Sequence, residues 1–381
     1  MKIAISTSVI QRGKTGVAQY VFALVKAMLP YTDRHDIHLL VLEKDRPLFD
    51  FVGDRMKIVG VPEKFQPAAR NVLWHQTALP AWLRSNHIDV IHVPSYRRMP
   101  WRAPCATVAT IHDLAPFHVA GKYDMARMFY GRVVVRWLAR RQDAIIAISG
   151  NTAQDIEKFF GIPVARLDVI LNGIDHARFS PGDPARAAAD AATRWKLDRP
   201  FFLYISRLEH PAKNHVRLIE AFNRFKSASG LDWLLVLGGT DWNGAEHIHA
   251  AAAASPFAKD IRFLGFIDDA ILPDLYRAAS AMVYPSLYEG FGFPPIEAMA
   301  CGCPVLSSTR GSLGEVVGDA AATVDPENIA DISAGLQRLA TDTAWRTQLR
   351  EAGFHNARRF DWADNAAKVL KVYERAAATR R

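Results

Sequence analysis

The stretch Ser286–Pro304, SLYEGFGFPPIEAMACGCP, joins a predicted strand to a predicted helix. The apolar run Ala281–Tyr284 before it is typical of a buried strand. The proline pair fits the first turn of a helix, where a missing N–H costs little. The two glycines of the turn let a ligand approach the main chain closely. A strand, a glycine turn and a helix in this order predict a binding site at the carboxyl end of a parallel sheet.

Two glutamates of this stretch are candidate ligands for hydroxyl groups. Glu289 lies in the turn, where its carboxylate could accept hydrogen bonds from a polyol. Glu297 lies in the first helical turn, where its charge suits the helix dipole and where it could accept from both vicinal hydroxyls of a ribose. The free N–H groups of the helix start form an anion site. Helix-start acids without a ligand are the alternative. The turn and helix start between the glutamates comprise Gly290, Phe291, Gly292 and Phe293.

The extended stretch SLYEGFGFPPIEAMACGCPVLSS closely resembles the signature of family 4 of the retaining glycosyltransferases, whose members have the GT-B fold. In that family two glutamates with seven residues between them contact the donor sugar and the nucleotide ribose. Glu289 and Glu297 have this spacing. The resemblance runs through most of the chain, although only this segment is highly specific. It implies transfer of a sugar from a nucleotide diphosphate to an acceptor hydroxyl.

Short apolar runs alternate with longer helical patterns in both halves of the chain. Continuous Val/Ile/Ala runs are typical of parallel strands covered on both faces. We therefore expect an α/β protein with two Rossmann-like doubly wound domains facing across a cleft, the GT-B fold. The predicted strands are Lys2–Ser6, Ile37–Val41, Val90–Val93, Ala106–Ile111, Ala144–Ile148, Asp168–Ile170, Phe201–Ile205, Trp233–Leu237, Ile261–Leu264, Ala281–Tyr284 and Pro304–Leu306. The predicted helices are Val17–Leu29, Met125–Arg140, Thr152–Phe160, 215–228, 270–279 and 294–301.

The alternation of predicted strands and helices in both halves of the chain predicts two domains. The N-terminal domain, residues 1–180, is predicted to bind the acceptor, and the C-terminal domain, residues 181–360, to bind the nucleotide sugar. We place the join at Ser180–Trp195, where proline and glycine precede an alanine-rich stretch. The helical tail 361–381 is expected to pack back on the N-terminal domain.

The segment Ser206–Asn214, SRLEHPAKN, follows the first predicted strand of the C-terminal domain. Arg207 and Lys213 would place two fixed cations there, where they could neutralise a diphosphate leaving group. In the resembled family an arginine and a lysine at this place bind the donor diphosphate, commonly with a spacing one residue shorter. We assign Asn214 as the cap of the next helix. A solvated loop is the alternative.

Three further positions are candidates. The loop GKTGVAQY, residues 13–20, fits neither the dinucleotide fingerprint nor the P-loop pattern. Its resemblance to the family's N-terminal glycine loop implies that the backbone of Gly16 faces the donor phosphates. His112 closes a buried strand and could orient a sugar hydroxyl, with Asp113 fixing its tautomer. A matching His-Asp pair occurs in many family members. Ile267 is a candidate for a backbone contact with the base. The alternatives are a turn glycine and a structural histidine.

Composition excludes several classes of protein. Half of the residues are hydrophobic and 23% are charged, as in a globular protein with a large core. The three cysteines form no disulfide framework, so we expect a cytoplasmic location. We interpret Cys301 and Cys303 as buried fillers. No run reaches the roughly 18 apolar residues of a membrane span. No Asp-x-Asp motif supports a metal-chelated diphosphate, so no metal or cofactor is expected beside the donor substrate.

The net charge of +8 is unevenly distributed. Residues 1–180 carry 24 Lys and Arg against 15 Asp and Glu, whereas residues 181–381 carry 23 against 24. This asymmetry suggests an anionic partner for the N-terminal half. No nucleic-acid-binding motif is present. An anionic membrane at the inner face of the plasma membrane therefore remains, contacted by the basic and apolar segment Arg127–Arg141. A core helix with a solvated basic face explains the segment equally well.

The motifs IHDLAP, SRLEHPAKN and SLYEGFG look most like those of bacterial polysaccharide transferases, including mannosyltransferases that use GDP-mannose. The resemblance implies transfer of mannose to a glycan or polyprenyl-diphosphate-linked acceptor in exopolysaccharide or lipopolysaccharide synthesis. UDP-glucose or another UDP-sugar is the rival donor. A nucleotide-sugar epimerase, a phosphorylase and a non-catalytic sugar-binding protein are the rival functions.

Overall fold

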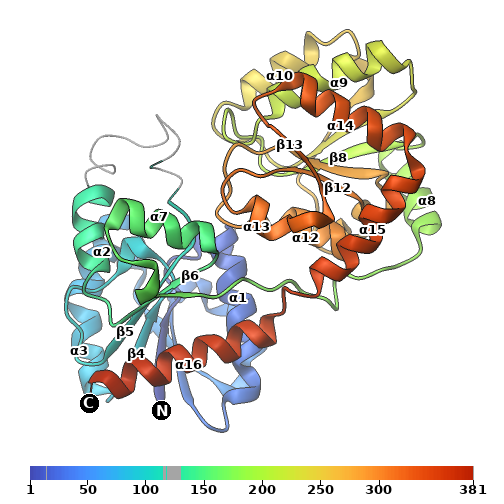
Figure 1. Cartoon of the computed structure of the whole chain (residues 1–381). Helices are drawn as coiled ribbons and strands as arrows, with labels where there is room; N and C mark the ends of the chain where they lie inside the picture. The colour runs from blue at the N-terminus through green and yellow to red at the C-terminus, as the bar shows by residue number, and fades with distance from the viewer. Residues whose placement is uncertain (14, 115–116, 118–129, 381) are drawn as a thin grey trace. The chain divides into compact units, whose positions relative to one another are not determined.

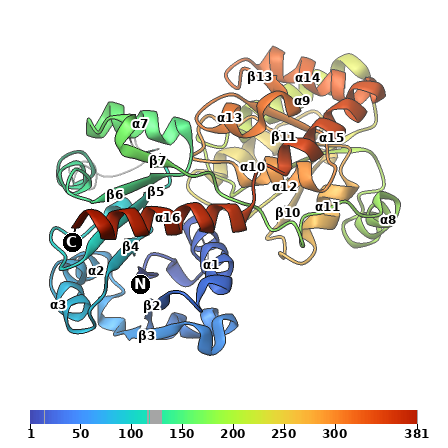
Figure 2. The ribbon, with the colours of Figure 1, turned by 60° about the horizontal axis from the view of Figure 1, so that its bottom comes forward.

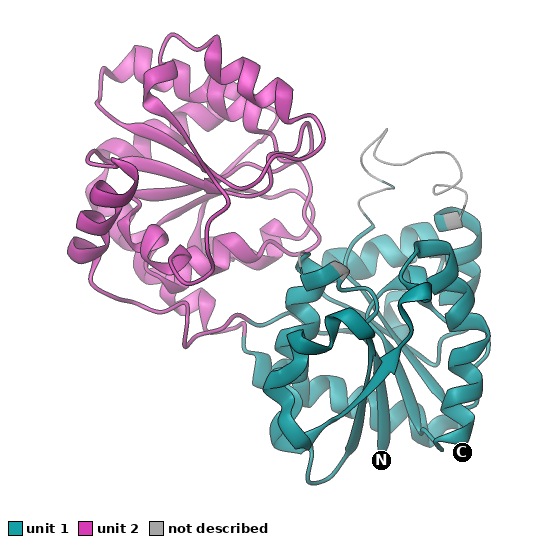
Figure 3. Ribbon diagram, turned by 180° about the vertical axis from the view of Figure 1, so that it is seen from behind, with its two compact units in different colours: residues 1–173, 361–381 teal, residues 174–360 magenta. Residues whose placement is uncertain are grey.

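The computed structural model describes residues 1–13, 15–114, 117 and 130–380, and it divides the chain into two compact units. Unit 1 contains Met1–Gly173 and Asp361–Arg381, and unit 2 contains Ile174–Phe360 (Figure 3). Each unit is built around one parallel sheet with helices on both faces (Figure 1). The predicted α/β class with two Rossmann-like doubly wound domains is confirmed.

The sheet of unit 1 has the strand order β3-β2-β1-β4-β5-β6-β7, with every neighbouring pair parallel. The order reverses between β1 and β4, and ligands of open α/β sheets bind beyond the carboxyl ends of strands at such a reversal. The strands are β1 (Lys2–Ser6), β2 (Asp36–Leu42), β3 (Lys57–Val61), β4 (Val90–Val93), β5 (Ala106–Ile111), β6 (Ala144–Ala147) and β7 (Leu167–Val169).

Capping side chains explain where two helices of unit 1 begin. Thr15 accepts a hydrogen bond from the N–H of Ala18 at the start of α1, and Ser149 accepts from Thr152 at the start of α7. The helices are α1 (Gly16–Met28), α2 (Ala68–Gln76), α3 (Ala78–Ser85), α6 (Arg136–Ala139), α7 (Gly150–Phe160) and α16 (Trp362–Arg380). Shorter segments are η1 (Gln11–Gly13), η2 (Leu29–Tyr31), η3 (Glu43–Arg55), η4 (Glu63–Phe65), η5 (Tyr96–Arg98), the π-helical η6 (Tyr130–Val135) and η7 (Val164–Arg166).

The predicted helix Met125–Arg140 and the basic segment Arg127–Arg141 begin at residues that lie outside the described part of the chain. From residue 130 onward they form η6 and α6. None of the helices in the described ranges is both long and apolar enough to cross a bilayer.

The C-terminal helix α16 belongs to unit 1. It packs against α1 and β5 and lies along the sheet (Figure 2). Leu370 and Tyr373 are buried in the core of this unit, and each such side chain contributes about 1.5–3 kcal/mol through removal from water. The Tyr373 hydroxyl also lies 2.6 Å from Nδ1 of His92 on β4. Helix α16 is thus part of the core.

The sheet of unit 2 has the order β10-β9-β8-β11-β12-β13 and is also parallel throughout. Its order reverses between β8 and β11, so the loops after these two strands meet at one edge. The strands are β8 (Phe201–Ile205), β9 (Leu234–Gly238), β10 (Ile261–Gly265), β11 (Ala281–Tyr284), β12 (Val305–Ser308) and β13 (Ala322–Val324). The helices are α8 (Pro184–Trp195), α9 (His215–Ser229), α10 (Ala245–Ala253), α11 (Leu272–Ala278), α12 (Phe293–Ala300), α13 (Leu313–Val317), α14 (Ile329–Thr341) and α15 (Thr343–Ala357), with η8 (Ala258–Asp260) and η9 (Gly318–Ala320).

The boundary between the units lies after Gly173, earlier than the expected position after residue 180. The segment 174–180 packs on unit 2, because the carbonyl of Ser180 accepts two hydrogen bonds from the Arg277 guanidinium at 3.0 and 2.7 Å. Most of the expected join Ser180–Trp195 is helix α8, which Asp183 caps by accepting from the N–H groups at 185 and 186.

Candidate functional site

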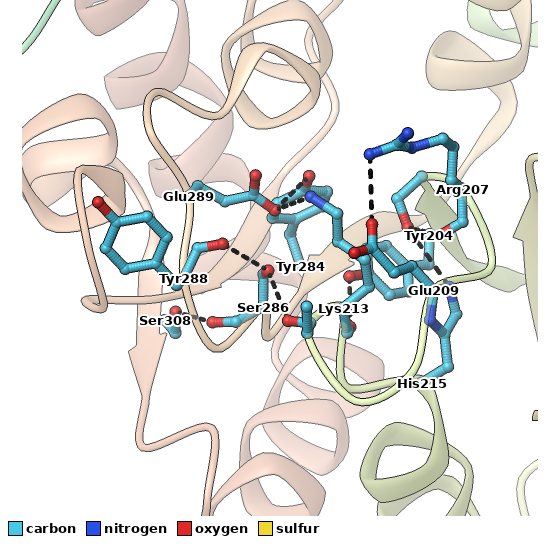
Figure 4. A network of polar contacts seen from close by, with 12 residues as sticks. Tyr204, Arg207, Glu209, Lys213, His215, Tyr284, Ser286, Tyr288, Glu289 and Ser308 are labelled. Carbon is cyan, nitrogen blue, oxygen red and sulfur yellow. Dashed lines mark hydrogen bonds and ion pairs between the residues drawn. The ribbon is translucent and has the colours of Figure 1, made fainter. Parts of the chain in front are cut away.

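A largely buried ion pair lies at the carboxyl edge of the unit 2 sheet. Nζ of Lys213, on the loop after β8, lies 2.6 Å from Oε1 of Glu289, in the turn after β11. The two side chains are only 15% and 13% exposed, and Figure 4 shows them pointing toward one another. The hydroxyl of Tyr284 donates to the same carboxylate oxygen at 2.9 Å. The reversal of strand order thus brings together two predicted site residues that are 76 positions apart.

The electrostatics of this pair favour two charged side chains. Burial by itself would raise the pKa of Glu289, but the Lys213 ammonium and the hydrogen bonds hold that pKa below its usual value. Burial and the charge of Glu289 raise the pKa of Tyr284, so this phenol remains a neutral donor. At neutral pH the site therefore holds one fixed carboxylate and one fixed ammonium.

Backbone contacts fix the position of Lys213. Its carbonyl accepts from the buried hydroxyl of Tyr204 at 2.6 Å, and its N–H donates to the carbonyl of Glu209 at 3.1 Å. The N–H of Leu287 donates to the carbonyl of Ala212 at 3.1 Å. The loops after β8 and β11 are therefore bonded to one another, and the ammonium has little freedom to move.

Asn214 does not cap α9 with its side chain as predicted. Its φ of 62° is left-handed, and its amide nitrogen donates to the carbonyls of Pro285 and Pro326 at 2.9 and 2.6 Å. The residue ties three loops together, which a short polar side chain in this conformation can do.

Arg207 is the accessible cation of the same loop. Its side chain is 47% exposed, and Nη2 lies 3.2 Å from a carboxylate oxygen of Glu209 (Figure 4). The guanidinium also lies over the indole of Trp242, 4.8 Å from the ring centroid. Trp242 follows β9, and its N–H donates to the carbonyl of Leu208. Glu209 and Trp242 thus orient a cation that remains open to solvent.

We expect Trp242→Ala to lower kcat/KM for the donor by roughly two- to fivefold, because an exposed cation–π contact contributes about 0.5–1 kcal/mol. Trp242→Phe should retain most of the activity, since it keeps an aromatic face under Arg207. Steady-state kinetics of the two variants check this. An equal loss of kcat/KM in both variants would show that the indole does not act by stacking on Arg207.

Glu297 is the fifth residue of α12, so it lies just past the first helical turn in which it was predicted, and it accepts a hydrogen bond from the hydroxyl of Tyr276 at 3.1 Å. Burial raises its pKa to about 7. The helix begins after Gly292, which has a left-handed φ of 98° and provides no capping side chain. A Cβ at this position would lie 2.6 Å from Leu313, so the turn requires glycine. The predicted helix start without a capping side chain is present, but Pro294 and Pro295 have no N–H, so it offers a positive dipole end rather than a row of N–H donors. The nearby carboxyl of Glu297 gives up its proton near neutral pH.

The aromatic residues of the turn stabilise it from within. Phe291 is 4% exposed, and its ring packs against those of Phe293 and Phe360 at 5.1 and 5.7 Å. The carbonyl of Gly290 accepts from the hydroxyl of Ser312 at 2.7 Å. The ring of Phe291 belongs to the core, so only its main chain is placed to meet a ligand.

Ile267 is similarly buried, at 9% exposure, and packs beside Gly238 at the end of β9. Phe266 before it is 74% exposed. The predicted contact of Ile267 with a base would therefore involve backbone, beside an exposed aromatic ring that the sequence analysis did not single out.

His112 follows β5 in unit 1. Its Nε2 donates to the carbonyl of Pro94 at 3.2 Å, and its ring meets that of Tyr20 edge-on at 4.7 Å. Burial lowers its pKa to about 4, so the ring is neutral at pH 7. Because a carbonyl only accepts, the contact with Pro94 places the proton on Nε2 and leaves Nδ1 as the acceptor. This contact is sufficient to set the tautomer, and the part of Asp113 in fixing it stays a prediction.

Gly16 is the first residue of α1 and is exposed. No heavy atom lies within 4 Å of the place where a Cβ would stand. The structure of the isolated unit therefore gives no packing reason for glycine here.

We expect Gly16→Ala to leave the melting temperature essentially unchanged and to lower kcat/KM for the donor, because only a bound ligand could collide with the new methyl group. Thermal unfolding and steady-state kinetics check the two halves of this expectation. Wild-type kinetics would mean that no donor atom comes close to this residue.

Three tyrosines that donate hydrogen bonds to the two carboxylates and to the carbonyl of the lysine were not predicted from the sequence. All three are buried, and the hydroxyl of a buried tyrosine usually has a hydrogen-bond partner. Tyrosines in apolar stretches next to the site motifs were therefore the signal that could have identified them. They are Tyr204, Tyr276 and Tyr284.

The described ranges contain no group of three or more His, Cys, Asp or Glu side chains suited to hold a metal ion. Cys301 and Cys303 are buried, as predicted.

Two family models match the chain. The model described as "Glycosyl transferases group 1" matches residues 186–356, and that described as "Glycosyltransferase Family 4" matches residues 14–178. Together they cover parts of both units.

Three proteins show how far the similarity extends. O-antigen chain mannosyltransferase B of Escherichia coli is 30% identical over 77% of this chain and 76% of its own length. The serotype-specific mannosyltransferase WbdA of the same species is 29% identical over 73% of this chain, which spans only 34% of that protein. The crystal structure of Anabaena Alr3699/HepE in complex with UDP-glucose matches with a TM-score of 0.76 at 20% identity, over 98% of this chain and 99% of its own.

Proposed function

The chain belongs to glycosyltransferase family 4, and from this membership we propose that it is a retaining enzyme that moves mannose from GDP-mannose to a hydroxyl of a glycan or lipid-linked oligosaccharide. The single observation that carries the proposal is the Lys213–Glu289 pair beside the free start of α12. A fixed ammonium, a fixed carboxylate and the positive dipole end of α12 at one sheet edge suit a ligand that combines a polyol with a diphosphate.

The donor would bind mainly to unit 2. Glu297 would accept from the ribose hydroxyls, and the backbone near Phe293 and Ile267 would meet the diphosphate and the base. Glu289 would accept from hydroxyls of the transferred sugar. We assign Glu289 to orienting the sugar, because the Lys213 ammonium and Tyr284 already stabilise its charge and so weaken it as a nucleophile.

The cations would stabilise the leaving group. An ammonium has three N–H donors, and the one recorded contact of Lys213 Nζ in the described structure is with Glu289. The remaining N–H groups and the Arg207 guanidinium would meet the oxygens of the departing diphosphate. These cations supply the charge that a metal would otherwise provide, so we propose a reaction without a metal ion or cofactor.

In the proposed reaction the bond between the anomeric carbon and the diphosphate oxygen breaks through an oxocarbenium-like state. The acceptor oxygen forms its bond on the same face, and its proton passes to the departing diphosphate. His112 and Gly16 of unit 1 would contact the sugar and the phosphates. The neutral His112 can accept a hydrogen bond from a sugar hydroxyl at Nδ1 without adding a positive charge to the site.

The donor is proposed from the relatives. Mannose is favoured by the similarity to an O-antigen chain mannosyltransferase, and the match to a structure in complex with UDP-glucose keeps a UDP-sugar as the second candidate. The same similarity supports an acceptor in bacterial polysaccharide or lipopolysaccharide synthesis. The small number of cysteines and the basic N-terminal half support a cytoplasmic enzyme acting near the membrane.

An assay of GDP and UDP release from a panel of sugar nucleotides, with acceptor present and absent, tests the proposal. We expect GDP-mannose to give the fastest acceptor-dependent release, and the product to keep the anomeric configuration by NMR. Faster release of UDP from UDP-glucose would identify UDP-glucose as the donor. Conversion of the sugar nucleotide without an acceptor would favour an epimerase. Binding without turnover would favour a sugar-binding protein, and pyridoxal-phosphate absorbance a phosphorylase.

A further inference from the structure

Two exposed tryptophans of unit 1 lie against one another outside the site described above. The rings of Trp101 and Trp137 are 5.4 Å apart, and the residues are 52% and 39% exposed. Each indole carries an arginine: Arg102 lies over Trp101 at 5.3 Å, and Arg141 lies over Trp137 at 3.5 Å. Four side chains from two separate segments thus form one amphipathic cluster.

This cluster is held by a rigid support. The buried Gln142 donates through Nε2 to the carbonyls of Pro100 and Leu138 at 3.2 and 2.9 Å, which binds the two segments together. The N–H of Trp101 donates to Oε1 of Gln76 at 2.7 Å. The indoles are therefore presented by fixed backbone.

The surroundings of the cluster are basic and partly apolar. Val133 is 51% exposed, one turn before Trp137. Arg136 and Arg140 each donate through Nε to the carbonyl of Phe160, at 3.2 and 2.9 Å, which holds both guanidinium groups beside the end of α7. We name this region the Trp101–Trp137 surface. Its members are Trp101, Arg102, Arg132, Val133, Arg136, Trp137, Arg140 and Arg141.

The arginines of this surface have no acidic partners among the described residues. Within the described ranges, no carboxylate lies within ion-pair distance of any of the five. By contrast, Arg12 pairs with Asp45 and Glu63, and Arg380 pairs with Asp143. Arg102 and Arg141 lie on the two exposed indoles, and Arg132, Arg136 and Arg140 follow along η6 and α6 toward α7. This positive charge beside exposed indoles calls for an anionic partner with an apolar layer.

We propose that the Trp101–Trp137 surface docks on an anionic lipid bilayer. Indoles favour the headgroup level of a membrane, where one edge is apolar and the other hydrated, and arginines there attract lipid phosphates. Val133 would enter the boundary of the acyl chains. A nucleic acid fits less well, because Arg102 and Arg141 already occupy ring faces on which bases would stack. The inference is independent of the donor and of the acceptor.

Vesicle flotation of the full chain tests the proposal, with phosphatidylcholine vesicles that contain or lack phosphatidylglycerol. We expect binding only to the anionic vesicles, and weaker binding as salt is added. Arg102→Gln/Arg141→Gln should lower the partition coefficient by roughly 30-fold, since each arginine near an anionic surface contributes about fivefold. Trp101→Ser/Trp137→Ser should remove the binding that remains at high salt.

A matched control comes from unit 2, where Arg194 and Arg338 also lie over tryptophan rings, at 5.5 and 3.8 Å. Arg194→Gln/Arg338→Gln should bind vesicles like the wild type. Circular dichroism and nucleotide binding on the same samples report whether each variant is folded. Equal partitioning of the two arginine double variants, no preference for anionic vesicles, or tighter binding to a DNA duplex at the same salt would each overturn the proposal.

Discussion

Lys213→Ala is expected to reduce kcat by roughly 10²–10³-fold, the usual effect of removing one donor that stabilises developing charge. The lysine would lose its contact with the departing diphosphate, while Arg207 on the same loop would remain. The substitution also leaves Glu289 buried without its cation. Breaking a buried pair at one side costs about 3–5 kcal/mol, so the variant should also melt at a lower temperature.

A second variant separates catalysis from stability. Lys213→Met/Glu289→Gln replaces both charges with neutral groups of similar size, and we expect it to recover much of the lost stability without recovering turnover. Steady-state kinetics and thermal unfolding of both variants provide the comparison. Turnover of the alanine variant close to that of the wild type would exclude Lys213 from the chemistry.

Glu297→Gln is expected to weaken binding of the nucleoside diphosphate by roughly 10- to 100-fold, because hydrogen bonds to a charged acceptor contribute about 1.5–3 kcal/mol. The free enzyme has a pKa of about 7 at this carboxyl. Ribose hydroxyls donate to the ionised form and so favour it. Binding should therefore release a proton below about pH 7, and affinity should rise with pH through this range.

Calorimetry in buffers of different ionisation enthalpy measures that proton, and the glutamine variant should release none. The pH dependence of folding stability has the opposite sign from that of binding affinity. Since the pKa of Glu297 is higher in the folded than in the unfolded chain, the folded state binds more protons between about pH 4.5 and 7, and this contribution to stability is lost as pH rises through that interval. Proton uptake on binding would contradict this assignment.

The architecture could be predicted because most strands are continuous apolar runs. The predicted strand over Phe201–Ile205 is β8, and that over Ala281–Tyr284 is β11. The strands β3 and β13 were missed. Both lie at sheet edges, where β3 is only partly buried and β13 has three residues, so neither leaves a strong apolar pattern. Helix α8 was taken for a linker because its many alanines do not mark a buried face.

The residues of the site could be predicted better than their contacts. The sequence indicated that Lys213 and Glu289 both serve the donor, yet it gave no sign that they neutralise one another across two loops. The raised pKa of Glu297 is likewise a consequence of burial, which is a tertiary property. Asn214 matched a capping pattern, but its left-handed backbone directs the side chain to other loops.

The most direct test of the account is a calorimetric titration of GDP and UDP into the wild type and into Glu289→Gln/Glu297→Gln. We expect that the wild type binds one of these nucleotides and that the double variant, while retaining its fold, loses most of that affinity. A wild type that binds neither nucleotide, or a double variant with unchanged affinity, would contradict it.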